Sequence, residues 1–372
     1  SKNTSSRTVL NKVHGSGQEL RGQRLKPSYA AVLCGLGLLA GTVSAGPTGG
    51  QVSAGTASIT QSGATTTIQQ ASQKAAIDWT SFSVGKSESV RFNQPNASAI
   101  TLNRVTGTER SEILGNLSAN GQVFILNPNG VLFGKGAQVN VGGLVASTLR
   151  MSNEDFMAGN YKFTEGVNGS AAVVNEGRIQ VAEGGVLALI APVVTNTGTL
   201  IAPQGSVLMA GADAVTVTLQ DGSLVSYTID KGNLQALVDN GGLIQAEGGH
   251  VVLTAKGLDA LSRAVVNHSG VIEAQTVLTK NGIVELLGDM EVGLINMSGK
   301  IDASAPNGGD GGFVETSAAK VTIQPDAYIT TLASKGKTGK FLLDPTDLTI
   351  AKQGGDLTGA WVSGQLARNN VF

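Results

Sequence analysis

The sequence GQVFILNPNGVLFGKGAQVNVGGLVAST, Gly121–Thr148, shows the features that recur through the chain. Short runs of β-branched and aromatic residues alternate in it with Asn-Pro-Asn-Gly and with spaced glycines, and it contains no acidic residue, cysteine or histidine. Pro128 fixes φ, and Gly130 accepts a positive φ. Asn127 and Asn129 can bond to nearby backbone, so the four residues predict a tight reversal between strands. The segment builds structure, and any function it has is recognition.

Glycine is abundant in this chain and charged residues are scarce. The 372 residues include 51 Gly and only 9 Pro, with 14% charged and 41% hydrophobic residues. The glycines follow no collagen period, and the hydrophobic content is too high for a disordered chain, so short strands and turns are predicted. From Gly46 onward, 20 Lys and Arg face 26 Asp and Glu, a net charge of −6. Nucleic acid is not an expected partner, because binding it normally requires a basic face.

The first 45 residues differ in kind from the rest. Six basic residues precede an apolar run, Ala30–Ala40, which is too short to span a bilayer. Val43 and Ala45 supply the small residues that signal peptidase reads at the −3 and −1 positions. We therefore predict a secretory signal peptide over residues 1–45, cleaved so that the processed chain begins at Gly46.

Past residue 170 the chain repeats one design: apolar residues, an Asn-containing turn, a glycine, and an Ile or Leu two positions later. Successive shared glycines lie 21, 43, 29 and 29 residues apart, at Gly177, Gly198, Gly241, Gly270 and Gly299. A basal period near 21 indicates a solenoid, in which each coil buries its apolar face on the next. The continuous apolar run Val186–Ile190 suits a parallel sheet buried within it. We predict an all-β fold, a right-handed parallel β-helix of about twelve coils and on the order of 55 Å long.

Longer gaps in the repeat predict insertions. The longest gap contains two alternating runs around an Asp-Gly pair, which predict an extra-helical β-hairpin over residues 214–230. The gaps of 29 residues predict loop insertions around Ala260–Ala264 and Leu286–Glu291. The polar, threonine-rich segment Gln51–Gln69 is predicted to cap the amino-terminal end, where a solenoid would otherwise expose an unpaired strand. Asparagines at the bends are expected to stack from coil to coil.

Two stretches resemble a known family. IDWTSFSVGKSESVRFNQPNASAITLNRV, Ile77–Val105, together with residues 121–148, resembles the amino-terminal secretion domain of filamentous haemagglutinin-type exoproteins, which are exported by two-partner secretion. The resemblance covers roughly residues 51–350. The family's second Asn-Pro-Asn-Gly motif falls intact on Asn127–Gly130. Its earlier Asn-Pro-Asn motif is replaced, as in the high-molecular-weight adhesin and haem/haemopexin-binding branch, by Asn93, Gln94, Pro95 and Asn96.

The resemblance implies a route and partners. The general secretory machinery and signal peptidase would act at the inner membrane. POTRA domains of a dedicated outer-membrane β-barrel transporter would then recognise the domain in the periplasm, and folding of the β-helix would start at the cell surface. The residues singled out for recognition are Asn127, Pro128, Asn129, Gly130, Asn93, Pro95, Asn96, Asn103 and Arg104. The alternative is that the Asn-Pro motifs only shape turns and that Arg104 caps a solvated strand.

Four segments follow from these interpretations. They are a signal peptide (1–45), a secretion domain (46–305), a continuing β-helix (306–350) and a truncated or unstructured tail (351–372). The chain stops in mid-pattern, so we expect it to belong to a longer, adhesin-like exoprotein that is secreted to the surface of a Gram-negative bacterium. A host-cell receptor or glycan would be bound by the region downstream.

Two other functions known for β-helices would leave different features in the sequence. A β-helix polysaccharide lyase or glycosidase would need a cluster of charged residues or a carboxylate pair on neighbouring coils. The equivalent repeat positions, which form no such cluster, are Gln180, Ala202, Gln245, Glu273 and Asp302. An autotransporter passenger would be followed by barrel strands, and none is visible. His250 and His268 lack a second ligand at metal spacing, and the one cysteine, Cys34, lies in the signal peptide. We predict no enzymatic activity, no cofactor and no metal.

Overall fold

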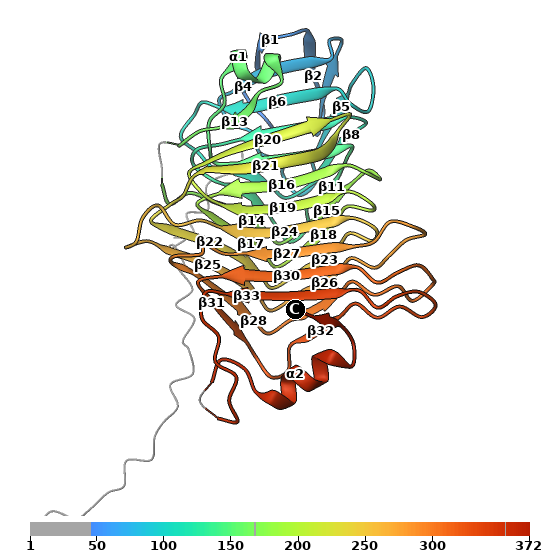
Figure 1. Cartoon of the computed structure of the whole chain (residues 1–372). Helices are drawn as coiled ribbons and strands as arrows, with labels where there is room; N and C mark the ends of the chain where they lie inside the picture. Colours follow the sequence, from blue (N-terminus) through green and yellow to red (C-terminus); the bar gives the residue numbers. More distant parts are fainter. Residues whose placement is uncertain (1–45, 167–168, 354) are drawn as a thin grey trace, which may run out of the picture. The chain divides into compact units, whose positions relative to one another are not determined.

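The computed structural model describes residues 46–166, 169–353 and 355–372, which form a parallel β-helix (Figure 1). Most coils pass through three long sheets, here named I, II and III, and the chain visits them in the order I, III, II. Sheet I contains β1 (Gln51–Ala54), β4 (Lys74–Trp79), β6 (Ile100–Val105), β9 (Gln122–Leu126), β12 (Gly143–Ser147), β16 (Val186–Ala191), β19 (Ser206–Gly211), β24 (His250–Ala255), β27 (Ile283–Leu287), β30 (Phe313–Ala318), β33 (Lys340–Pro345) and β34 (Asn370–Val371).

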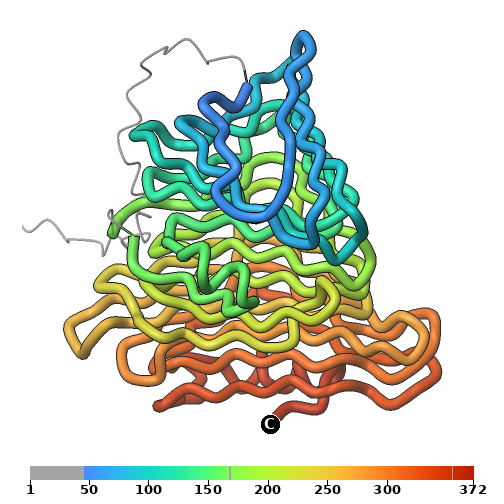
Figure 2. The backbone as a smooth tube through the Cα atoms, turned by 90° about the horizontal axis from the view of Figure 1, so that it is seen from above, coloured from blue at the N-terminus to red at the C-terminus, as the bar shows by residue number. Residues whose placement is uncertain are grey.

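The other two long sheets complete each coil. Sheet II contains β2 (Ala57–Ser62), β3 (Thr65–Gln70), β5 (Ser89–Asn93), β8 (Asn116–Ala119), β11 (Gln138–Val141), β15 (Arg178–Val181), β18 (Thr199–Ile201), β23 (Leu243–Gln245), β26 (Val271–Glu273), β29 (Lys300–Asp302) and β32 (Tyr328–Thr330). Sheet III contains β7 (Ser111–Ile113), β10 (Val131–Phe133), β14 (Ala172–Asn175), β17 (Val193–Asn196), β22 (Gln235–Asn240), β25 (Arg263–His268), β28 (Gly293–Met297) and β31 (Lys320–Ile323). Figure 2 shows the chain passing from blue to red along the stack.

The prediction of a parallel solenoid is confirmed by the strand registers. Ile179 of β15 lies between Val139 of β11 and Leu200 of β18, and all three side chains are fully or almost fully buried in the interior. Sheet I is buried on both faces at its middle. In β16, Leu187 and Leu189 face the interior, whereas Val186, Ala188 and Ile190 belong to a second apolar cluster on the outer face. This double burial explains why the strand reads as continuously apolar.

The predicted cap is confirmed. Strands β2 and β3 form an antiparallel hairpin at the amino-terminal end of sheet II, and β3 then pairs in parallel with β5. Strand β1 runs antiparallel to β4 and so covers the first edge of sheet I. Because both edges are paired by polar strands, the first coil does not expose an open apolar edge.

The extra-helical hairpin is also confirmed, as β20 (Ala214–Gln220) and β21 (Ser223–Lys231). It belongs to a small sheet whose third strand is β13 (Tyr161–Phe163), which follows helix α1 (Asn153–Ala158). Neither β13 nor α1 was predicted from the sequence. These elements cover the outer face of sheet I (Figure 1), where Phe124 packs edge-on against Phe156 and Tyr161. Aromatic pairs of this geometry stabilise a packed layer beyond their buried area.

Both predicted loop insertions lie close to the expected positions. One loop precedes β25, where the Ser262 hydroxyl and the Asp259 carboxylate hold a turn together. The other follows β27, where the Asp289 carboxylate accepts hydrogen bonds from the backbone nitrogens of Glu291 and Val292. The coils lengthen here without breaking the registers of the sheets.

Asparagines stack at the corner between sheets III and II, as predicted. The side-chain amide of Asn175 donates to Asn196 at 2.8 Å, and Asn196 donates to Asn240 at 2.8 Å. The ladder continues to Nδ1 of His268, 3.1 Å from the Asn240 amide nitrogen, while Nε2 of His268 lies 3.1 Å from the carbonyl oxygen of Lys300. Since all four side chains are completely buried, each coil must satisfy the polar groups of its neighbour.

The expectation of an unstructured end is wrong. Residues 359–366 form helix α2 (Gly359–Leu366), capped by Thr358, and β34 then adds to sheet I beside β33. Trp361 of the helix packs edge-on against the buried Phe341, so the segment covers the last coil of the described chain. Among the described residues, no helix is long and apolar enough to cross a membrane.

Candidate functional site

The Asn-Pro-Asn-Gly turn, residues 127–130, connects β9 to β10. The Asn127 side chain is completely buried. Its amide nitrogen donates to the carbonyl oxygen of Glu109 at 2.9 Å and to Oγ of Ser111 at 3.0 Å, both in the preceding coil. Its Oδ1 accepts from the backbone and side-chain nitrogens of Asn129, at 2.9 and 3.1 Å. Asn127 therefore shapes the turn and fixes it to the coil before.

The rest of the turn is only partly covered. Pro128 and Asn129 are half-exposed, and the Asn129 amide donates to the carbonyl oxygen of Gly107 at 2.9 Å. Gly130 has a φ of 118°, a backbone conformation that residues other than glycine rarely adopt. Its carbonyl oxygen accepts from the backbone nitrogen of Ser111 at 3.0 Å. The turn presents a proline ring and an amide to solvent from a rigid base.

The earlier motif lies at the opposite corner, between β5 and β6. Asn93 donates to Gln69 at 3.2 Å, and the exposed Asn96 exchanges hydrogen bonds with Gln73 at 2.8 and 3.3 Å. Pro95 is exposed beside it. These contacts fasten the motif to the amino-terminal cap and its connection to β4.

Gln94, which interrupts this motif, was not selected from the sequence, yet it is the buried centre of the corner. Its Nε2 lies within hydrogen-bond distance of the carbonyl oxygens of Ala99 and Gln122, at 3.1 and 2.9 Å, and of Oγ1 of Thr101 at 3.0 Å. Its Oε1 accepts from the backbone nitrogen of Gly121 at 2.9 Å. A glutamine here bridges two successive coils.

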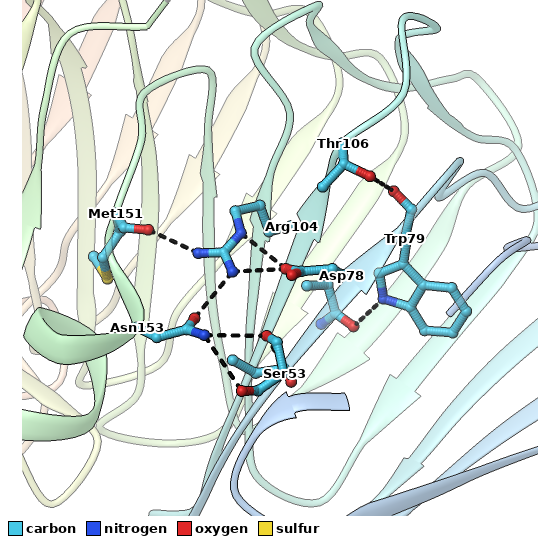
Figure 3. A network of polar contacts seen from close by, with 9 residues as sticks. Ser53, Asp78, Trp79, Arg104, Thr106, Met151 and Asn153 are labelled. Carbon is cyan, nitrogen blue, oxygen red and sulfur yellow. Dashed lines mark hydrogen bonds and ion pairs between the residues drawn. The ribbon is translucent and has the colours of Figure 1, made fainter. Parts of the chain in front are cut away.

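Asn103 and Arg104 tie several elements together, and Figure 3 shows the contacts of Arg104 with Asp78, Met151 and Asn153. The buried Asn103 accepts from Nε1 of Trp79 at 3.1 Å. Arg104 forms an ion pair with Asp78 at 2.7 Å and donates to the carbonyl oxygen of Met151 and to Oδ1 of Asn153, both at 3.0 Å. The view of Arg104 as the cap of a solvated strand is wrong, because its guanidinium joins β4, β6 and the segment that begins α1.

One cleft brings Arg104 and the second motif together. It has a volume of about 420 Å³, and its lining includes Arg104, Pro128, Asn129, Leu126, Leu149 and Met151. The exposed Arg150 also lines it, and the guanidinium of Arg150 makes no ion pair or hydrogen bond with another described residue. The first motif does not reach this cleft, because it lies at the other end of β9, roughly 16 Å away for a five-residue strand.

The residues of the predicted cleavage site are only partly visible. Val43 and Ala45 lie outside the described residues. Gly46 is the first described residue; it is buried, and its backbone nitrogen donates to Oε2 of Glu88 at 2.8 Å.

Of the five repeat positions considered for catalysis, four lie on strands of sheet II, and Ala202 follows β18. Glu273 pairs in register with Gln245 on one neighbouring coil and with Asp302 on the other. The next coil beyond Gln245 places Ile201 in this register, whereas Ala202 belongs to the buried interior. Burial alone would raise the pKa of Asp302, but hydrogen bonds from Ser304 and Gln275 outweigh the effect of burial and lower that pKa. The Asp302 side chain therefore favours the carboxylate form. Among the residues described, no group of three His, Cys, Asp or Glu side chains could hold a metal ion.

Comparison of the sequence and the fold with known proteins identifies the family of this chain. The sequence profile of the TPS secretion domain matches residues 43–303, well over half of the chain. The chain belongs to the TPS secretion domain family. The secretion domain is similar in structure to the HMW1 secretion domain from Haemophilus influenzae, with a TM-score of 0.64 and 28% identity, covering 80% of this chain and 87% of the other.

Two curated relatives are heme/hemopexin-binding proteins of Haemophilus influenzae. One, from strain Rd, is 36% identical over 229 residues, which cover 60% of this chain; the other is 37% identical over 243 residues, covering 59%. In both cases the match covers 25% of the relative, so the secretion domain spans about a quarter of their length. The predicted family and branch are confirmed. Membership implies an outer-membrane transporter as partner and secretion by a Gram-negative bacterium.

Proposed function

We propose that POTRA domains of the outer-membrane transporter recognise this secretion domain at the cleft beside the Asn127–Gly130 turn. The observation that supports this is that one cleft is lined both by Arg104 and by Pro128 and Asn129 of the second motif, three of the residues that the family resemblance singled out. Arg150 is exposed, its guanidinium pairs with no other residue that the structure describes, and it adds a positive charge at the same place. A charge that has no partner among the described residues is available to steer and orient an acidic partner.

The two interpretations of the motif then apply to different residues. Asn127 is buried and hydrogen-bonded on all sides, so its contribution is to shape the turn. Asn129, Pro128 and Arg150 keep exposed surface and are the ones that a partner can touch. At the distant corner, Pro95 and Asn96 offer a second exposed contact.

The route that we propose begins with export by the general secretory machinery and cleavage by signal peptidase before Gly46. The chain then crosses the periplasm to its transporter, and coils fold as they emerge outside. Each emerging coil would bury residues such as Ile179 on the coil before it. Adding strands to a growing sheet edge needs no nucleotide and opposes backsliding.

We assign any binding of a host receptor or glycan, and any capture of haem, to sequence beyond the secretion domain. The relatives whose names mention heme and hemopexin are about four times as long as the matched segment. We also propose that the secretion domain itself performs no catalysis.

The proposal is tested by secretion in a host that expresses the exoprotein with or without its transporter. Secretion should require the transporter, and Arg150→Glu should reduce it strongly while inner-membrane export continues. Arg178→Glu is the matched control, because Arg178 is also exposed but lies on sheet II. Secretion without the transporter would contradict the proposed function, and equal secretion by both variants would contradict the cleft as its site.

A further inference from the structure

The backbone nitrogen of Gly46 and the carboxylate of Glu88 lie together at the amino-terminal end of the β-helix. The nitrogen donates to Oε2 of Glu88 at 2.8 Å, and the backbone nitrogen of Gly85 donates to the same oxygen at 2.7 Å. Glu88 is half-buried and forms no ion pair with a lysine or arginine of the described chain. A partly buried carboxylate that accepts only from neutral N–H groups lacks the cation that would compensate for its charge.

The position of Gly46 is fixed by its neighbours. Thr48 donates its backbone nitrogen to the carbonyl oxygen of Ser81 at 2.9 Å, and the two hydroxyls lie 2.7 Å apart. The backbone nitrogen of Thr80 donates to the carbonyl oxygen of Thr48 at 3.0 Å. Gly46 itself is buried, and a Cβ there would approach Oγ1 of Thr66 to 3.3 Å. The nitrogen of residue 46 is thus held at Glu88 by the strand register of the cap.

Cleavage before Gly46 would change the chemistry of this nitrogen. Hydrolysis of the Ala45–Gly46 peptide bond consumes one water, breaks the carbon–nitrogen bond and leaves a carboxylate on Ala45. The released Gly46 nitrogen becomes an α-amine, which carries a proton and a positive charge at neutral pH, since its ordinary pKa is about 8. The neutral donor next to Glu88 would become an ammonium with three N–H bonds.

We propose that Glu88 is a binding site for the α-ammonium group that signal-peptide removal creates on Gly46. Processing then converts a neutral hydrogen bond into an ion pair that fastens residues 46–54, which lead into the cap, to the turn before β5. The precursor lacks this ion pair, so its cap is held less firmly until the signal peptide has been removed. This inference rests on cleavage at Gly46 and is independent of which surface binds the transporter.

The experiment compares the processed chain, residues 46–372, with the same chain retaining Ala45, each with Glu88 or with Glu88→Gln. Amino-terminal sequencing of secreted protein first establishes the cleavage site. Denaturant unfolding of the four proteins forms a double-mutant cycle. We expect Glu88→Gln to shift the unfolding midpoint clearly more in the processed chain than in the chain retaining Ala45. Equal shifts would show a neutral hydrogen bond only and would overturn the proposal.

A second measurement does not depend on the variant folding well. The rate of acylation of the Gly46 α-amine by an amine-reactive reagent is followed against pH, in the folded processed chain and in urea. An ion pair with Glu88 should raise the apparent pKa of the α-amine in the folded chain by about one pH unit, which slows labelling near pH 7 about tenfold. An α-amine that titrates identically in both states would contradict the ion pair.

Discussion

The side-chain amide of Asn127 donates to Oγ of Ser111, 3.0 Å away, and so joins the turn after β9 to the first residue of β7 in the preceding coil. Both side chains are completely buried. A motif residue that the family resemblance suggested for recognition thereby bonds two coils together, and we propose that its exposed neighbours are the residues that a partner contacts.

Asn127→Ala is expected to destabilise the fold by about 2–3 kcal/mol, because it leaves the Ser111 hydroxyl and the Glu109 carbonyl without their shared donor. Denaturant unfolding measures the change. Asn96→Ala is the control, since Asn96 is exposed and should cost less than about 1 kcal/mol. Equal costs for the two variants would refute the structural role of Asn127.

Ile179→Asp should lower the free energy of unfolding by several kcal/mol, because it places an unpaired charge between Val139 and Leu200. Gln180→Asp, one residue later on the half-exposed face, should cost far less. Circular dichroism with denaturant titration checks both. A tolerated Ile179→Asp would mean that the interior of this coil is not packed as described.

His268 should make stability depend on pH. Burial lowers the pKa of His268 from 6.5 to about 4, whereas the unfolded chain keeps the ordinary value. As the pH falls, the unfolded chain takes up the proton first, so this contribution to stability is complete above about pH 6.5 and is lost progressively down to about pH 4. The loss is roughly 3 kcal/mol.

His268→Asn tests this reasoning, because an asparagine can continue the ladder from Asn240 without titrating. Unfolding measured at several pH values between 7 and 4 should show a shallower decline for the variant. The same pH dependence in both proteins would assign the effect to other groups.

Phe156→Ala should loosen helix α1 and the small outer sheet while leaving the interior of the β-helix intact. Phe156 is completely buried against Phe124 and Tyr161, so its truncation should cost about 3–5 kcal/mol for unfolding of that layer. Hydrogen exchange should accelerate in residues 153–163 and 214–231 more than in β15 or β18. Uniform acceleration would instead indicate that the layer and the β-helix unfold as one unit.

Signal peptidase processing should yield a secreted chain that begins at Gly46. Amino-terminal sequencing of the secreted protein checks this directly. A start several residues away from Gly46 would refute the predicted cleavage.

Much of the fold could be predicted because it repeats. The spacing of Gly177 and Gly198 reports the length of one undecorated coil, and the hairpin, the cap and the stacked asparagines each have local signatures. Helix α1 had such a signature too, since Ser152 caps its start and Gly159 its end. It was missed because six residues form a short helix whose stability comes from distant contacts, above all that of Phe156 with Phe124.

The candidate site was harder to predict. The motif residues could be named, but their burial depends on the packing of successive coils: Asn127 and Asn129 look alike in sequence, yet only Asn127 is fully enclosed. Gln94 departs from the family motif and gave no reason to be selected, although three carbonyl or hydroxyl oxygens converge on its amide. Arg150 lies outside every motif, and only its position beside the cleft in the folded chain marks it as a candidate for recognition.

Binding of the purified POTRA region of the cognate transporter to the processed chain measures recognition separately from export and folding. The chain carrying Asn129→Ile and Arg150→Glu, with its β-structure verified, should bind at least about tenfold more weakly than the unchanged chain, a loss of about 1.4 kcal/mol or more. Arg178→Glu should bind like the unchanged chain. If the folded double variant binds as tightly as the control, the transporter does not recognise this cleft.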